Sequence, residues 1–290
     1  MTKLGITLFA TLAFGLAGSA QTFTSHPVRI PGGAAVQVTG INDSGTMVAN
    51  YTDTAGFAAC VMISGSTMTQ LVDPNQVLVG PGSGTSCWAI NNAGQIAGSY
   101  SASSFGNGFL YSNGVYSDII VPTATAGTTA YGLNNTGSVS GSFADNVGQH
   151  AFVYNVSAGT FTTLDVPGAA FTLGAGINDS GEVVLQWLNS SFTYFGAIYK
   201  AGHFRVLNVP NMADSAPYGI NVHGWINFAG RDSNGVWHGF LYKGGVFTQY
   251  DVANSANTLG FGINDSGVMV GFFNPASAST TQVGFQGRIH

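Results

Sequence analysis

The sequence predicts an all-β fold, a six-bladed β-propeller with four antiparallel strands in each blade. Three observations lead to this prediction. A short motif recurs six times at a nearly constant spacing, apolar residues alternate after each copy, and the two ends of the chain carry complementary parts of one repeat. Repeats of about 40 residues made of short strands are typical of propellers.

The motif follows the pattern Gly-Ile-Asn-Asp-Ser-Gly and marks the start of each repeat. Its asparagines are separated by 49, 43, 44, 43 and 43 residues and stand at Asn42, Asn91, Asn134, Asn178, Asn221 and Asn264. In such a motif the asparagine side chain caps a tight turn, and the last glycine supplies a positive φ. Each copy therefore predicts a hairpin turn.

Apolar residues at even separations follow every turn. Five residues beyond the motif asparagine stand Met47, Ile96, Val139, Val183, Ile226 and Met269. A period of two indicates a strand with one face toward a core. Segments such as 108–111 and 161–167 predict a third and a fourth strand in each repeat.

The two termini predict how the ring closes. The last repeat lacks a fourth strand, whereas residues 28–33 near the N-terminus resemble residues 164–169 at the end of a complete repeat. We therefore expect Thr22 to Ile30 to complete the last blade and to remove the open sheet edges. An open stack of sheets is the alternative architecture, but it would leave an unpaired strand at each end.

The first 20 residues have the pattern of a signal peptide. Lys3 precedes an apolar stretch from Leu4 to Leu16, and small residues lead to Ala20 and Gln21, where we expect cleavage. We therefore divide the chain into a signal peptide, residues 1–20, and a single six-repeat propeller domain, residues 21–290. This division predicts a secreted, periplasmic or cell-surface protein.

Composition limits the classes of partner. Only 7% of the residues are charged, the net charge is −5, and Lys plus Arg number seven. Such a chain offers no basic patch for phosphates, so we expect no nucleic acid partner. The mature chain has no apolar run of membrane-spanning length. We expect no cofactor and no metal, because the histidines lack paired ligand spacing and the Asn-Asp-Ser-Gly turns lack the acids of a calcium loop.

The motif copies, together with His150-Ala151-Phe152 and His238-Gly239-Phe240, resemble the HAF-repeat extracellular proteins of bacteria. The resemblance covers nearly the whole mature chain. It implies an exported, propeller-like repeat protein, and it brings no catalytic residues with it.

Cys60 and Cys87 are the only cysteines. Cys60 takes a third-strand position that Phe109 and Phe152 occupy in later repeats, and Cys87 leads into the next blade. Because exported proteins fold in an oxidising compartment, we expect a disulfide between the first two blades, with two separately buried thiols as the alternative.

The sequence favours a non-enzymatic scaffold or binding module that binds its ligand on the loop face of the ring. Carbohydrate and another extracellular protein both remain open as partners. No catalytic residue is predicted, and the ligand-binding candidates in or beside variable loops are Asp145, Asn146, Trp187, Tyr194, Arg231, Asp232 and Trp237.

A second group of aromatic residues stands three positions before the motif asparagine. Trp88, Tyr131, Tyr218 and Phe261 share strand parity with core residues, so we interpret them as packing between blades. The alternative function is a propeller glycoside hydrolase or polysaccharide lyase. It would require Asp145, Arg231 and Asp232 to converge at the mouth of the central channel.

Overall fold

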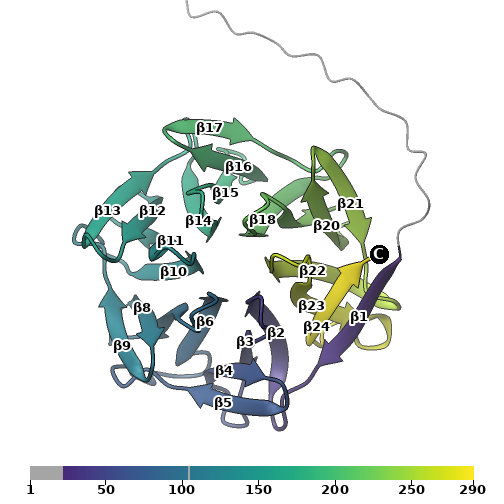
Figure 1. The fold of residues 1–290 in the computed structure, drawn as a ribbon, viewed down its shortest axis with the longest axis horizontal. Coiled ribbons are helices and arrows are strands. Elements are labelled where there is room, and N and C mark those ends of the chain that lie inside the picture. Colours follow the sequence, from purple (N-terminus) through teal and green to yellow (C-terminus); the bar gives the residue numbers. More distant parts are fainter. Residues whose placement is uncertain (1–21, 104) are drawn as a thin grey trace, which may run out of the picture.

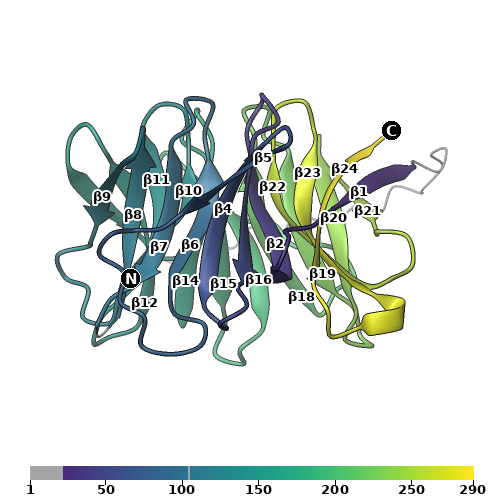
Figure 2. The same ribbon diagram turned by 90° about the horizontal axis from the view of Figure 1, so that it is seen from below.

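A computed structural model describes residues 22–103 and 105–290, and the expected signal peptide lies outside them. Figure 1 shows wedge-shaped sheets arranged in a ring around a central axis, and in Figure 2 the strands run along that axis with loops at both edges. The fold is an all-β propeller. In the part of the chain that the structure describes, the only helical segment is one 3₁₀ turn, η1 (Ala276–Ala278). The same part contains no helix with the length and hydropathy that crossing a membrane requires.

Four sheets have four antiparallel strands each. The first contains β2 (Ala34–Ile41), β3 (Met47–Thr52), β4 (Ala58–Ser64) and β5 (Thr67–Leu71). The second contains β6 (Thr85–Ile90), β7 (Ile96–Ser101), β8 (Gly106–Ser112) and β9 (Val115–Ile119). Another contains β18 (Asp214–Ile220), β19 (Ile226–Arg231), β20 (Trp237–Lys243) and β21 (Val246–Tyr250). The last combines β22 (Ser255–Ile263), β23 (Met269–Pro275) and β24 (Val283–Ile289) with β1 (Phe23–Val28).

The remaining strands form one eight-stranded sheet. Its first half contains β10 (Thr128–Leu133), β11 (Ser138–Ala144), β12 (Gln149–Asn155) and β13 (Thr160–Leu164). Its second half contains β14 (Phe171–Ile177), β15 (Val183–Leu188), β16 (Tyr194–Lys200) and β17 (His203–Val206).

The prediction of six separate sheets therefore needs a correction, which has a local cause. The halves of the eight-stranded sheet are joined by one parallel residue pair, Gln149 with Phe171. A similar single parallel bridge, Ala58 with Gly84, links the first two sheets. Both bridges connect the start of a third strand with the start of the next innermost strand, and the Gln149–Phe171 pair is the one that merges two sheets. We call each four-stranded sheet, and each half of the eight-stranded sheet, a unit, and number the units one to six in chain order from β2.

The N-terminal segment lies where the sequence predicts it. β1 pairs antiparallel with β24 along its whole length, from Phe23 opposite Ile289 to Val28 opposite Gly284. Figure 1 shows β1 on the outside of this sheet, beside the C-terminal strand β24. One sheet thus contains both the first and the last strand of the described chain.

The motif turns gather around the axis at one edge, which we call the motif-turn face. Each motif asparagine accepts hydrogen bonds from its own turn, as when Asn42 Oδ1 accepts from the Thr46 N–H at 3.0 Å. The motif glycines have positive φ, as expected, for example 79° at Gly45. The opposite edge, which we call the loop face, carries the connections between units and the turns between the second and third strand of each unit.

The same asparagines also join the units. Each donates through Nδ2 to the backbone carbonyl of the next motif asparagine at 3.0–3.1 Å, and Asn264 donates to Asn42, which closes the cycle. The sequence predicts the turn cap, but it does not predict this second bond between repeats.

Candidate functional site

A cavity of about 330 Å³ lies on the axis of the ring. Its wall comes from the innermost strands, in layers that repeat from unit to unit. Three positions before the motif asparagine stand Thr39, Trp88, Tyr131, Ala175, Tyr218 and Phe261, and all of them line the cavity. This volume lies within the range of small-molecule sites, about 300–1,000 Å³.

A β-bulge lies at this position in each innermost strand. In β10, for example, Ala130 pairs with Gly141 and Gly132 with Ser140, so that Tyr131 is the extra residue. The same shift occurs in the other five inner strands. A bulge re-aims the side chain of the unpaired residue, and here these side chains line the axial cavity.

The aromatic members of this layer form two pairs between neighbouring units. The Trp88 and Tyr131 ring centroids are 5.2 Å apart, and the Tyr218 and Phe261 centroids are 4.7 Å apart. The predicted packing between repeats is therefore present, and the same side chains also line a cavity. In Figure 1 the strands that carry one pair, β6 and β10, lie across the axis from β18 and β22. Small residues, Thr39 and Ala175, stand between the pairs on β2 and β14.

One position further along the strand, five of the six units have glycine and the second has Ala89, and these small residues let the units approach one another. An ideal Cβ at Gly176 would lie 2.5 Å from the carbonyl oxygen of Tyr218 in the next unit. A larger residue would thus push the inner strands apart. Glycine keeps the cavity narrow.

An aliphatic layer and a polar layer narrow the channel toward the motif-turn face. The aliphatic residues directly precede the motif asparagines and are buried: Ile41, Ile90, Leu133, Ile177, Ile220 and Ile263. Beyond them a much smaller polar space of about 70 Å³ lies among the motif turns. The wide part of the cavity therefore lies on the loop-face side of these layers.

Acidic and amide side chains in the narrow polar space bond to neighbouring turns. Asp43 Oδ1 accepts from the Asp265 N–H at 2.8 Å, and Asp43 Oδ2 accepts from Asn92 Nδ2 at 2.6 Å. Burial opposes ionisation of Asp43, but these hydrogen bonds hold its pKa below the ordinary value. The residue after a motif asparagine donates through its N–H to the side chain at the same place in the next turn, as Asn135 does to Asp179. This series of bonds stops at Asp179, because Val222 in the next turn has no side-chain acceptor. This layer links the turns to one another.

The loop-face candidates on the unit of β10–β13 bond to their own turn and to the connection that precedes the unit. Asp145 Oδ1 accepts from the Val147 N–H at 2.7 Å and lies 3.3 Å from His150 Nε2. Asn146 Oδ1 accepts from the Thr125 hydroxyl at 3.2 Å. Both residues thus hold the local loop structure.

On the fourth and fifth units, the other candidates form local contacts as well. Trp187 stacks on Phe195 with centroids 4.8 Å apart. Tyr194 is 37% exposed. Arg231 bonds to the buried Asp214, and its guanidinium lies 5.9 Å from the centre of the Trp237 ring. Asp232 caps a turn. None of the seven candidates lines the axial cavity, and they are spread over three units.

The histidines of the HAF-like segments lie between pairs of carboxylates. His150 Nδ1 is 2.9 Å from Asp165, and its Nε2 faces Asp145. Burial lowers the pKa of His150, but the hydrogen bond and charge of Asp165, aided by Asp145, outweigh it and raise the pKa above 6.5. His238 lies in the same way near Asp251 and Asp232, at 3.0 and 3.8 Å. The arrangement fastens a third strand to the loops around it.

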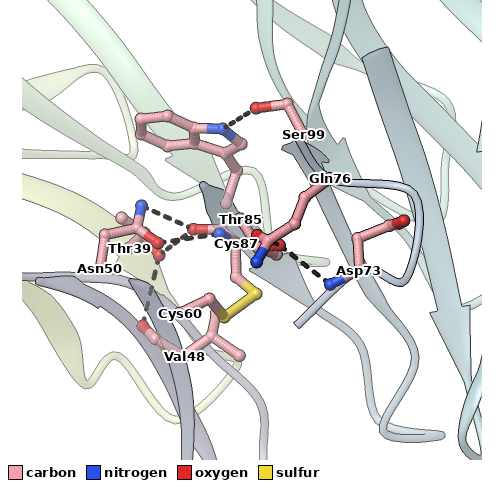
Figure 3. Close-up of a disulfide and its surroundings, with 10 residues drawn as sticks. Thr39, Val48, Asn50, Cys60, Asp73, Gln76, Thr85, Cys87 and Ser99 are labelled. Carbon is pink, nitrogen blue, oxygen red and sulfur yellow. Dashed lines mark hydrogen bonds between the residues drawn. A yellow bond between two sulfur atoms is a disulfide. The ribbon is translucent and has the colours of Figure 1, made fainter. Parts of the chain in front are cut away.

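A disulfide joins the first two units. The Cα atoms of Cys60 and Cys87 are 5.6 Å apart, and both side chains are fully buried. Figure 3 shows the bond between the strands, close to the hydrogen bond that Asn50 Nδ2 donates to the Cys87 carbonyl at 3.0 Å. The disulfide predicted from the sequence between the first two blades is therefore present.

A buried acid lies close to this disulfide. Asp73 is fully buried, and its Oδ2 has no hydrogen-bond partner (Figure 3). Burial raises the pKa of Asp73, and the bond that Oδ1 accepts from the Asn75 N–H only partly offsets this effect. At the same place the other units have buried aliphatic residues, which are Ile30, Val121, Val166, Val209 and Val252.

We predict that Asp73→Asn stabilises the protein at neutral pH by about 1 kcal/mol, because it removes a buried charge and keeps the turn acceptor. The folded-state pKa of Asp73 is raised, so ionisation of this carboxyl lowers the free energy of unfolding of the wild-type protein as the pH rises above the unfolded value of 3.8. The gain should therefore disappear below about pH 3.8. Urea unfolding of both proteins across this range measures it, and a gain that does not change with pH would contradict the account.

Among the described residues there is no group of three or more His, Cys, Asp or Glu side chains that could hold a metal ion. The residues that sequence reasoning missed are the cavity-lining Gln37, Leu173 and Gln186. The only sequence signal for the cavity was the aromatic residue three positions before the motif asparagine in four repeats.

No protein-family model matches the chain, and no curated protein matches it. Solved structures do resemble it. A putative TolB from Agrobacterium tumefaciens is 9% identical with a TM-score of 0.61, and the match covers 89% of this chain and 91% of that one. The fucose-recognising lectin from Aleuria aurantia, a six-bladed β-propeller, is 13% identical with a TM-score of 0.52, and the match covers 89% and 92%.

TolB from Acinetobacter baumannii is 12% identical with a TM-score of 0.56. The match covers 89% of this chain but only 56% of that protein. At such identities the likeness shows the β-propeller fold alone.

Proposed function

We propose that this chain is an exported, non-enzymatic binding module of six blades that takes a small molecule in its axial cavity. The six units, each with one motif turn, act as the blades. The observation that carries the proposal is the cavity itself, which is bounded by two aromatic pairs and narrowed at one end by the aliphatic layer. Apolar pockets with a few polar groups are the usual form of a small-molecule site.

Export is supported by the signal-like residues 1–20 and by the buried Cys60–Cys87 disulfide, which suits an oxidising compartment. The resemblance to HAF-repeat extracellular proteins belongs to the same proposal. Several propellers with similar folds are described as lectins in complex with fucosides, which makes carbohydrate one of the ligand classes to test.

The alternative, a glycoside hydrolase or polysaccharide lyase, has less support. Glycoside hydrolysis needs two carboxyl groups that flank the scissile bond. Among the described residues that line the axial cavity, none is acidic. Asp145 and Asp232 cap separate turns, and Arg231 bonds to Asp214.

A ligand panel tests the proposal. Neutral sugars, organic cations and organic anions are titrated against the protein, and binding is followed by calorimetry and tryptophan fluorescence. We expect at least one class to bind, with Trp88→Leu or Ala175→Leu weakening it by about tenfold or more, because the first removes an aromatic contact and the second fills the cavity. Trp237→Leu, on the loop face, is the matched control and should bind normally.

Thermal unfolding first confirms that each variant is folded. Binding that survives both cavity substitutions but is lost in Trp237→Leu would place the site among the loop-face candidates. Fragments released from a polysaccharide would contradict the non-enzymatic part of the proposal.

A further inference from the structure

Four of the six polar side chains in the cavity wall, all except Tyr131 and Tyr218, donate a hydrogen bond to another part of the protein. Gln37 Nε2 donates to Gln282 Oε1 at 2.8 Å, and Gln186 Nε2 donates to the Pro217 carbonyl at 2.9 Å. The Thr39 hydroxyl donates to the Cys87 carbonyl at 2.8 Å. Trp88 Nε1 donates to the Ser99 hydroxyl oxygen at 3.4 Å.

This arrangement is unfavourable for a ligand that must form many hydrogen bonds. A sugar carries several hydroxyl groups, and each one that is buried without a partner costs about 1–3 kcal/mol. Two tyrosine hydroxyls could satisfy only a few of them, and for the others the wall would have to break bonds that its donors already make. The cavity is therefore better suited to a ligand whose polar character needs no hydrogen bonds.

The aromatic pairs provide an attraction that works without hydrogen bonds. The two rings are inclined by 59° in the Trp88–Tyr131 pair and by 70° in the Tyr218–Phe261 pair, so each pair forms a corner rather than a flat stack. Burial raises the pKa of Tyr218 to about 12, so its phenol stays neutral at physiological pH. Aromatic rings attract cations through the negative potential of their π faces, and cages of such rings recognise quaternary ammonium groups.

The charge distribution of the ring favours the same ligand class. Within two residues of strand ends on the loop face there are eight of the twelve acids: Asp53, Asp73, Asp118, Asp145, Asp165, Asp214, Asp232 and Asp251. On the same face, by the same criterion, the described part of the chain has three cationic Lys or Arg residues, Arg29, Arg205 and Arg231. A face with this excess of acids attracts cations and repels anions. The described cavity wall itself contains no charged residue that would pair with an anion.

We propose that the axial cavity binds an organic cation with a methylated ammonium group, held between the Trp88–Tyr131 and Tyr218–Phe261 pairs. This inference rests on the proposed function, since it names the ligand class of the same cavity. Methyl groups on the nitrogen fill the apolar space, and the positive charge interacts with the rings. Neither needs the wall to give up an existing hydrogen bond.

The test compares choline with its neutral isostere, in which a quaternary carbon replaces the nitrogen. Tetramethylammonium and methyl fucoside are measured alongside by calorimetry at low and physiological salt. We expect choline and tetramethylammonium to bind at least about tenfold more tightly than the isostere, because only the charge differs between choline and the isostere.

Two substitutions of one residue separate the aromatic ring from the hydroxyl group. Tyr218→Phe keeps the ring and should retain choline binding within about twofold, whereas Tyr218→Leu should weaken it by about tenfold. Both variants are first shown by thermal unfolding to be folded. Equal losses in the two variants would assign binding to the hydroxyl group and would overturn the inference.

The outcomes also separate this inference from the proposed function. Equal affinity for choline and the isostere, or binding of methyl fucoside alone in a manner sensitive to Trp88→Leu, would overturn the cation inference and leave the small-molecule site standing. If no compound of the whole panel binds in the cavity, both fail. Tight choline binding that Trp88→Leu and Ala175→Leu do not affect would likewise overturn the inference.

Discussion

A chain that lacks residues 22–30 is expected to unfold with a free energy lower by at least about 3 kcal/mol and to associate in solution. β1 pairs with β24 over its whole length, and the Phe23 ring lies 4.6 Å from Tyr250 and 5.9 Å from Phe285 between centroids. Deletion removes this aromatic contact and the buried Ile30. It also leaves β24 as an exposed edge, which can pair with another copy of the chain.

Denaturant unfolding and size-exclusion chromatography measure the two effects. A chain that begins at residue 21 is the matched control and should behave as a stable, closed ring. Phe23→Ala should reproduce part of the stability loss without exposing the edge, whereas Thr24→Ala, on an exposed position of β1, should have little effect. If the deleted chain unfolds at the same denaturant concentration and elutes as a monomer, β1 does not close the ring.

Much of the fold could be predicted because the residues of each repeat predict its turn and strands without reference to the other repeats. The asparagine and glycine of the motif define the turn, and alternating residues such as Val139 and Phe143 define the strand after it. The resemblance between residues 28–33 and 164–169 located the closing strand, since only a piece of a repeat could complete the last sheet. These signals are local and recur, so chance copies are easy to reject.

The axial cavity was not predictable in the same way. Strand parity placed Tyr131 and Tyr218 on the packing side, but the bulge in each inner strand makes these residues unpaired, so that they line the cavity. A bulge is a mismatch between two strands and has no signature in one of them. The second bond of the motif asparagines was missed for a related reason, because it links repeats that are 43 to 49 residues apart.

Loop residues were the least predictable. Asp145 and Asp232 each follow the second strand of a unit, and the sequence shows no partner for either. A charged residue in a variable loop is compatible with a ligand-binding site and with a turn cap. The structure places each on the backbone N–H groups of its own turn. Asp73 shows the reverse case, because a carboxyl that looks like a loop residue lies in a core position that is aliphatic in the other units.

Loss of the Cys60–Cys87 disulfide is expected to lower the free energy of unfolding by about 3 kcal/mol, since the bond closes a 27-residue separation in the unfolded chain. The double variant Cys60→Ala/Cys87→Ala removes it. Because both sulfurs are fully buried in the folded protein, reductant acts mainly on the unfolded chain. Unfolding of the wild type and the variant, each with and without reductant, therefore separates the contribution of the bond from that of packing.

The two proteins should differ most without reductant, and the difference should shrink to the packing loss when reductant is present. A difference that reductant does not change would assign the whole effect to packing. The bond also lies beside the longest connection between units, residues 72–84. Because this connection constrains β5 and β6 least, amide exchange in the variant should increase there first, and uniform acceleration in all units would contradict a local role for the disulfide.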